Sequence, residues 1–225
     1  ALVRGAQING YDDQGNSALI IALATRRLSV ALLLLDRGAD PDLPGHGGKP
    51  PLFFALETQD PTIVAQLLRY GANPGQRDSA SNTCWHIAAQ AGKTNLCELL
   101  LSNRQEINSA DQNGYRPTHW IGHNHDDVST LEWFAAHGAN LTVPAPPDNA
   151  SLASLAARRN RPGMLRVLFD LGQPIDDIDG TRRTPLIHAV MYESSAAVAM
   201  LLHLGADPHK PTFSGTALEI AERDR

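Results

Sequence analysis

The amino-acid sequence predicts an all-α protein built as a quasi-linear stack of repeated helical units. A short phrase recurs in one register, with steps of 33, 33, 33, 34, 34 and 32 residues between its copies. The seven copies begin at Ser17, Pro50, Thr83, Arg116, Ala150, Thr184 and Thr216. A second phrase, Gly-Ala followed by Asp or Asn, runs in phase with the first and begins at Gly38, Gly71, Gly138 and Gly205. A fixed period of this length indicates units that each pack on their sequence neighbours.

The elements of one unit can be justified in order from residues 78–108. Residues 78–82 are rich in turn formers and predict a hairpin tip, and Thr83 is a good N-cap for a first helix that Gly92 ends. A second helix over 94–102 is apolar enough to be covered on two sides. In most other units this helix ends at a glycine, which can adopt the left-handed conformation that stops a helix. Arg104 stands at that position here, so we expect a less regular corner.

The phrases Thr184-Pro185-Leu186, Pro50-Pro51-Leu52 and Thr83-Cys84-Trp85-His86 resemble the Thr-Pro-Leu-His motif of the ankyrin-repeat family. The resemblance extends over essentially the whole chain and implies an ankyrin-repeat α-solenoid with short β-hairpin-like loops. In that fold, inner helices and hairpins line a concave groove, and outer helices form the back.

We expect a single domain of about six full repeats with a partial repeat at each end. The repeats are expected at about 10–42, 43–75, 76–108, 109–142, 143–176 and 177–208, with partial repeats at 1–9 and 209–225. Both ends fall inside a repeat, which predicts a fragment of a longer protein.

Two repeats in the middle of the chain depart from the pattern. The repeat near Asp111 has Thr118 in place of the core leucine and one extra residue around 123–127. The next repeat opens with Pro144-Ala145-Pro146-Pro147, so we expect an irregular hairpin, and we expect its extra residue between its helices around 158–163.

Composition narrows the function classes. The formal net charge of −5 argues against general binding to nucleic acid or a membrane surface, and no apolar run is long enough for a membrane span. Cys84 and Cys97, the two cysteines, fall on packed positions, and we expect a reducing, cytoplasmic location. No nucleophile elbow or phosphate-binding glycine loop is present, so we expect no enzyme activity and no cofactor.

A histidine cluster offers a remote enzymatic alternative. His119 and His123 are four residues apart, a spacing that can bind a metal, and His125 and Asp126-Asp127 follow. The family resemblance instead implies a structural role for His119 and His86. A metal-dependent enzyme at 119–127 is therefore the least favoured interpretation.

Several arginine and aromatic residues are candidates for contacting a partner. Arginine pairs with carboxylates in two-pronged geometry, and arginine and aromatic side chains dominate interface energies. The expected anchors are Tyr115, His123, Asn124, Arg158, Arg159, Arg182, Arg183 and Tyr192. Phe213 is a further aromatic residue at a hairpin. Core positions are expected for Trp85, Trp133, Phe134 and Phe169. Phe54 and Trp120 share one position on the inner helices, which we expect to be partly exposed.

These observations favour a non-catalytic protein–protein interaction module. We expect a monomer that docks a protein partner, with an acidic segment, on its groove and hairpin tips. The alternative is a substrate-recruiting or regulatory arm of a larger enzyme or bacterial effector. Leu100 and residues 106–108 also resemble the asparagine-hydroxylation pattern of ankyrin proteins, with Asn108 as acceptor.

Overall fold

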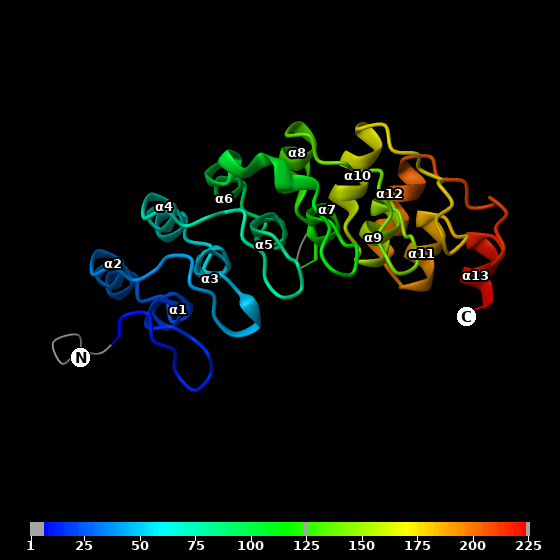
Figure 1. Ribbon diagram of the computed structural model, residues 1–225. Helices are drawn as coiled ribbons and strands as arrows, with labels where there is room; N and C mark the ends of the chain where they lie inside the picture. The colour runs from blue at the N-terminus through cyan, green and yellow to red at the C-terminus, as the bar shows by residue number, and fades with distance from the viewer. Residues whose placement is uncertain (1–6, 124–125, 224–225) are drawn as a thin grey trace. The chain divides into compact units, whose positions relative to one another are not determined.

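The structure is a computed structural model that describes residues 7–123 and 126–223. Its described secondary structure is helical apart from two isolated β-bridges, Tyr11 with Ser17 and Ala145 with Ala150. The chain divides into two compact units, Ala1–Gln112 and Asn113–Arg225, and each is a series of helical pairs joined by hairpin loops (Figure 1). The predicted all-α repeat fold is confirmed.

The first unit contains three helical pairs. Their inner helices, α1 (Ala18–Ala24), α3 (Pro51–Glu57) and α5 (Cys84–Ala91), contact one another in sequence order. The outer helices are α2 (Leu28–Asp36), α4 (Pro61–Arg69) and α6 (Thr94–Leu99), and α4 packs against α6. The described residues of this unit also include two 3-10 segments, η2 (His46–Gly48) and η3 (Leu101–Asn108).

The second unit repeats this arrangement with three pairs and one further inner helix. The inner helices are α7 (Pro117–Trp120), α9 (Leu152–Arg158), α11 (Pro185–Met191) and α13 (Ala217–Arg223), and each contacts the next. The outer helices α8 (Val128–Ala136), α10 (Pro162–Asp170) and α12 (Ser195–His203) also pack in order.

Local sequence explains where the helices begin and end. The Ser17 and Thr184 hydroxyls accept hydrogen bonds from the backbone N–H groups of Ile20 and Ile187, at 3.3 Å each. A proline as first helical residue loses no intrahelical hydrogen bond, which suits α3, α4, α7, α10 and α11. Glycines with positive φ follow the outer helices α2, α4, α8, α10 and α12, as the pattern predicts.

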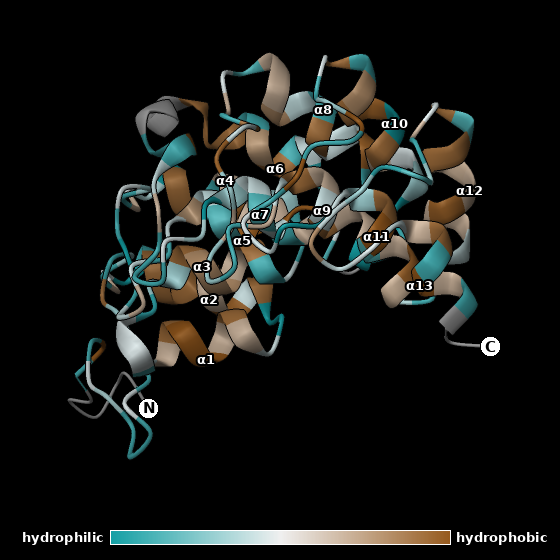
Figure 2. Cartoon of the chain, turned by 90° about the vertical axis from the view of Figure 1, so that its right-hand side faces the viewer, coloured by the Kyte–Doolittle hydropathy of each residue, from teal (hydrophilic) through white to brown (hydrophobic). Residues whose placement is uncertain are grey.

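The core lies between the inner and outer rows of helices within each unit. Figure 2 shows hydrophobic residues on the helices and hydrophilic residues along much of the connecting loops. Cys84, Cys97, Trp85 and Phe134 are fully buried, as predicted from the repeat. The same prediction is wrong for Phe169, which is 39% exposed. Phe169 lies one residue beyond the buried Leu168, and successive helical residues point about 100° apart.

The register predicted for the fifth repeat is wrong by one residue. Ser151, not Ala150, is the N-cap of α9, and its hydroxyl accepts from the Ser154 N–H at 3.0 Å. Ala150 instead pairs with Ala145 across the hairpin, with N–H···O distances of 2.8 and 3.1 Å.

Only one of the two extra residues therefore lies where the sequence predicts it. It is between α7 and α8, since α8 begins twelve residues after the N-cap of α7, whereas α10 begins eleven residues after the N-cap of α9 (116 to 128, 151 to 162). The other is in the hairpin before α9, and none lies at 158–163. This hairpin closes between residues five apart, whereas the hairpins starting at Asp12, Asp78 and Asp179 close between residues four apart, so its predicted irregularity is confirmed.

The corner after α6 is also irregular, as the replacement of glycine by Arg104 predicts. Helix α6 has six residues, and the chain continues into η3 rather than stopping at a left-handed residue. Asn108, the candidate modification site, is the last residue of η3 and is half-buried.

Candidate functional site

The hairpin between α10 and α11 carries two of the expected anchors, and its buried aspartate shapes it. The Asp179 N–H donates to the Arg183 carbonyl at 3.1 Å, which closes the turn. One Asp179 carboxylate oxygen accepts the Thr181 N–H at 2.9 Å and the Thr181 hydroxyl at 2.5 Å. This turn places Arg182 at the exposed apex with φ of 59°.

Arg182 occupies a conformation that glycine adopts at other hairpin tips. The equivalent positions in four other repeats are Gly15, Gly48, Gly114 and Gly215, with φ between 69° and 100°. A side chain in this region costs roughly 1 kcal/mol or more because Cβ crowds the backbone. The turn therefore holds an arginine at the apex at the expense of local strain.

A buried polar network connects this hairpin to α9 and α11. His188 Nε2 donates to the second Asp179 carboxylate oxygen at 2.8 Å, and its Nδ1 accepts from Arg158 Nε at 3.2 Å. Arg158 also forms an ion pair with Asp148 at 2.6 Å. These partners define the neutral tautomer of His188, with its proton on Nε2.

The pKa values follow from this geometry. Burial lowers the pKa of His188, and the neighbouring Arg158 charge lowers it further, which together outweigh the attraction of Asp179. A second imidazole proton would also point at the Arg158 N–H donor. Burial acts to raise the pKa of Asp179, but the hydrogen bond from Thr181 and the interaction with His188 bring it below its usual range.

Two exposed aromatic rings lie beside these arginines. Phe213, in the loop before α13, is 83% exposed, and Tyr192, the C-cap of α11, is 57% exposed. The Arg182 guanidinium lies over the Phe213 ring at 5.5 Å, and that of Arg158 over the Tyr192 ring at 5.8 Å. Each ring thus has a cation on one side and stays accessible to solvent.

We call Arg182, Arg183, Tyr192 and Phe213 the arginine–aromatic surface. Arg183 is half-buried, and its Nε donates to the Ser214 hydroxyl at 3.2 Å. Within residues 7–123 and 126–223, the Arg182 guanidinium makes no hydrogen bond and no ion pair. The surface therefore presents a positive charge without a carboxylate partner next to an exposed ring.

Arg159, another expected anchor, has an internal role. Its guanidinium donates to the carbonyls of His119 and Ile121 at 3.0 and 3.2 Å, and burial lowers its pKa. Arg161 donates in the same way to the Gly122 carbonyl at 2.8 Å. Helix α7 has four residues, so these carbonyls lack a following helical turn, and the next repeat supplies their donors.

The remaining expected anchors lie in the fourth repeat. Tyr115 is half-buried and makes an edge contact with the His119 ring, with centroids 6.2 Å apart. His123 is exposed, and Asn124 lies outside the described residues, as does His125. The structure thus pairs two of the expected anchors, Arg158 and Tyr192, and pairs Arg182 with Phe213, whereas Tyr115 and His123 lie apart in the fourth repeat.

The predicted structural role of His86 and His119 is confirmed by their contacts. His86 Nδ1 accepts the Thr83 N–H at 3.1 Å, and His119 Nδ1 accepts the Arg116 N–H at 3.0 Å. His119 Nε2 donates to the Val143 carbonyl at 2.9 Å, so both ring nitrogens bond within the chain. The described part of the chain holds no group of three His, Cys, Asp or Glu side chains that could bind a metal.

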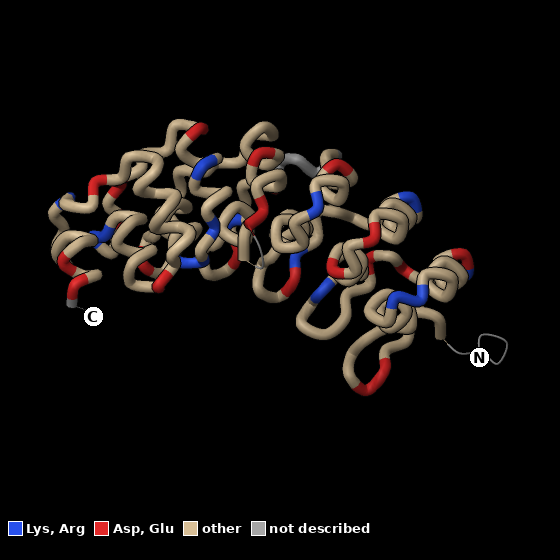
Figure 3. Tube along the Cα trace, turned by 180° about the vertical axis from the view of Figure 1, so that it is seen from behind, with Lys and Arg blue, Asp and Glu red and all other residues tan. Residues whose placement is uncertain are grey.

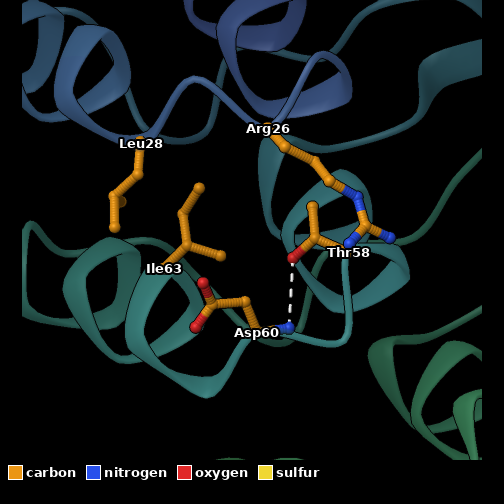
Figure 4. A pocket seen from close by; sticks show the side chains of 5 residues that line it. All are labelled: Arg26, Leu28, Thr58, Asp60 and Ile63. Atoms are coloured by element: carbon orange, nitrogen blue, oxygen red, sulfur yellow. Dashed lines mark hydrogen bonds between the residues drawn. The ribbon is translucent and has the colours of Figure 1, made fainter.

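A hollow in the first unit is too small for a typical ligand. Five side chains line it, namely Arg26, Leu28, Thr58, Asp60 and Ile63 (Figure 4). Its volume of about 50 Å³ is far below the roughly 300 Å³ of small-molecule sites. The Asp60 N–H donates to the Thr58 hydroxyl at 3.2 Å, so these two polar groups of the lining already bond to each other.

A larger hollow of about 480 Å³ lies open beside α11, α12 and α13 in the second unit. Its lining is mostly small aliphatic, with Glu193 and Ser195 as its polar side chains. Small-molecule sites use convergent polar groups to orient a ligand, and this lining offers few. We therefore interpret it as a packing surface.

Charges of both signs are interspersed along each unit (Figure 3). This pattern matches the small net charge of the chain. None of the described helices has the length and hydropathy needed to cross a membrane.

Sequence reasoning missed Asp148, Asp179 and His188 as parts of the site. His188 lies four residues after its N-cap, one position beyond the family's usual histidine, so the motif gave it no role. Asp179 has the same place in its hairpin as Asp12 and Asp78, whose carboxylates also accept two backbone N–H groups. That shared position was a usable signal, whereas the His188 contact depends on neighbouring repeats.

Comparison with known families gives a consistent match. The family model "Ankyrin repeats (3 copies)" matches residues 52–145 and 121–212, and "Ankyrin repeat" matches residues 14–46. The chain is 28% identical over 177 residues to human SH3 and multiple ankyrin repeat domains protein 2, covering 76% of this chain and 9% of that protein. It is 40% identical over 86 residues to human neurogenic locus notch homolog protein 4, covering 37% and 4%. The chain thus spans a small part of these relatives.

Solved structures show the same fold. The ankyrin repeat domain of human ASB11 aligns with a TM-score of 0.80 at 21% identity, covering 92% of each chain. The ankyrin repeat domain of Bcl-3, a member of the IkappaB protein family, aligns with a TM-score of 0.73 at 21% identity, covering 93% of this chain and 95% of that one.

Proposed function

The chain belongs to the ankyrin-repeat family, and on that premise we propose that it is a non-catalytic module that docks a protein partner on its groove side and hairpin tips. Ankyrin repeats are generally protein–protein interaction modules, and their fold is typically non-catalytic. The specific surface, the acidic character of the partner and a monomeric state are our proposals.

The exposure of Phe213 and Tyr192 carries the proposal. Aromatic residues make up 5% of this chain, and most of its large aromatic side chains are at least half-buried. An exposed ring gains free energy when a partner covers it, and aromatic and arginine side chains are the usual interface hot spots. Both features meet at the arginine–aromatic surface.

Arginine supports a partner that carries an acidic segment. The Arg182 guanidinium projects from a strained turn and has its donors available for a carboxylate. Tyr115 and His123 remain expected anchors in the fourth repeat. We leave Arg159 out of the proposed interface because two of its hydrogen bonds already stabilise the end of α7.

Capture of cellular proteins tests this function. The 225-residue chain is compared with the Tyr192→Ala/Phe213→Ala double variant and with Phe169→Ala, which also removes an exposed ring but from the outer helix α10. We expect the double variant to lose captured proteins that Phe169→Ala retains. Equal capture by all three proteins, each shown to be folded by circular dichroism, would contradict the proposed surface.

A regulatory or substrate-recruiting arm of a larger protein is the second candidate. It is favoured by the much greater length of two human relatives, because the chain spans 4% of the notch homolog and 9% of the SH3 and multiple ankyrin repeat domains protein. Capture by the full-length natural protein and by this chain, compared side by side, tests it. A partner set that is the same for both would oppose a role that depends on other domains.

A further inference from the structure

From the arginine–aromatic surface we infer a partner segment of defined pattern: a carboxylate side chain at the Arg182–Phe213 tip, followed along an extended chain by an apolar side chain at Tyr192. The inference rests on the proposed docking function and adds the chemistry and spacing of the bound segment. Two features carry it, one at the hairpin before α11 and one at the C-cap of α11.

At the first point, Arg182 and Phe213 form one recognition site from two adjacent hairpins. The guanidinium lies 5.5 Å from the centre of the ring, while the ring is 83% exposed. A guanidinium placed over a ring face makes no hydrogen bond to it, so a carboxylate can accept two of its N–H donors. The adjoining ring can cover the methylene groups of the same acidic side chain.

The backbone at this point supports a role in binding. Arg182 stands in the left-handed region at a position that is glycine in four other repeats and is Ser81 or Asn149, also with positive φ, in two more. Arginine is the long, charged side chain among these residues, and the turn directs it outward from the apex. Here the Asp179 carboxylate and the turn hydrogen bonds hold the strained residue in place.

At the second point, the Tyr192 ring is 57% exposed beside a fixed cation. Arg158 lies over it at 5.8 Å and is itself positioned by its ion pair with Asp148 and by its hydrogen bond to His188. The exposed part of the ring can be covered by an aliphatic or aromatic side chain of the partner, which removes apolar surface from water.

The rise of helix α11 sets a lower limit for the spacing between the two points. Its seven residues rise about 10 Å, at roughly 1.5 Å per residue, and Arg182 stands in the hairpin before its N-cap. An extended peptide spans this rise in about three to four residues, at roughly 3.3 Å each. The pattern is therefore an acidic residue with an apolar residue at least three or four positions away.

Synthetic peptides test the pattern directly. The probe is a fluorescein-labelled 12-residue peptide with Glu and, four residues on, Leu in a Gly/Ser background, and its binding to the whole 225-residue chain is measured by fluorescence anisotropy. Matched peptides carry Gln, Lys or phosphoserine in place of Glu. We expect the Glu peptide to bind on the order of fivefold more tightly than the Gln peptide, and more weakly as salt is raised.

Variants assign the contact to its residues. Arg182→Gly retains the turn because glycine suits the φ value, and we expect it to bring the Glu peptide down to the affinity of the Gln peptide. Phe213→Ser should weaken both peptides, whereas Arg166→Gln, which removes an exposed arginine paired with Asp170 on α10, should change neither. Equal binding of the Glu and Gln peptides, or equal loss of both in Arg182→Gly, would overturn the inference. Much tighter binding of the phosphoserine peptide would overturn the carboxylate assignment.

The outcome is separable from that of the proposed function. If Tyr192→Ala/Phe213→Ala abolishes protein capture while the Glu and Gln peptides bind equally, the docking surface stands and the acidic pattern is wrong.

Discussion

The Thr118 side chain in α7 is buried where the same repeat position holds a leucine in α1, α3 and α11. It is 1% exposed, and its hydroxyl has no hydrogen-bond partner within the described residues. Leaving a buried hydroxyl unsatisfied costs about 1–3 kcal/mol, since its hydrogen bond to water is lost on folding. We therefore expect Thr118→Val, which keeps the branched shape and removes the hydroxyl, to stabilise the protein by about 1 kcal/mol.

Thermal and urea unfolding measure this effect. A stabilisation of 1 kcal/mol corresponds to a rise in Tm of about 2–4 °C for a chain of this size. The matched control is Thr184→Val, because Thr184 is equally buried and its hydroxyl accepts the Ile187 N–H at 3.3 Å at the start of α11. Losing that N-cap should cost about 1 kcal/mol. The reasoning is refuted if Thr118→Val lowers Tm, or if the two variants shift Tm in the same direction.

Three further predictions concern the second unit. The pKa of His188 in the folded protein is below its usual value of 6.5, so below that pH the unfolded chain binds more protons than the folded chain and stability falls. Melting curves recorded as the pH is lowered below 6.5 should therefore show a falling Tm, and a smaller fall in His188→Gln. Arg159→Met removes two hydrogen bonds to the carbonyls after α7 and should cost about 2 kcal/mol in urea unfolding, whereas Arg166→Met, which breaks an exposed pair, should change stability by less than about 0.5 kcal/mol. Arg182→Gly relieves a left-handed backbone and should raise Tm slightly, by the equivalent of about 0.5 kcal/mol; a lower Tm would show that the Phe213 contact outweighs the strain.

Local sequence was sufficient for most of the fold because the signals are short-range. N-cap hydroxyls such as Thr184, helix-starting prolines such as Pro51 and helix-ending glycines such as Gly38 act within one or two turns. Their regular spacing revealed the repeat, and the replacement of glycine by Arg104 indicated the irregular corner before η3.

The register of the fifth repeat needed the structure. Ala150 and Ser151 are adjacent, and a phrase match cannot tell which of them caps α9. Hydrogen bonds across the hairpin from Ala145 to Ala150 decide the matter, since they make Ser151 the first residue free to cap the helix.

The candidate site also combines features that the sequence predicts with features that only the structure shows. Sequence alone identified arginine and aromatic residues at hairpin tips and helix ends, because repeat position predicts which residues face outward. Only tertiary structure decided their partners: Arg159 turns to carbonyls of the preceding repeat, Arg158 joins Asp148 and His188, and Arg182 lies over a ring of the next hairpin. These contacts join residues 10 to 40 positions apart, and their geometry depends on how neighbouring repeats pack, which a single repeat does not encode.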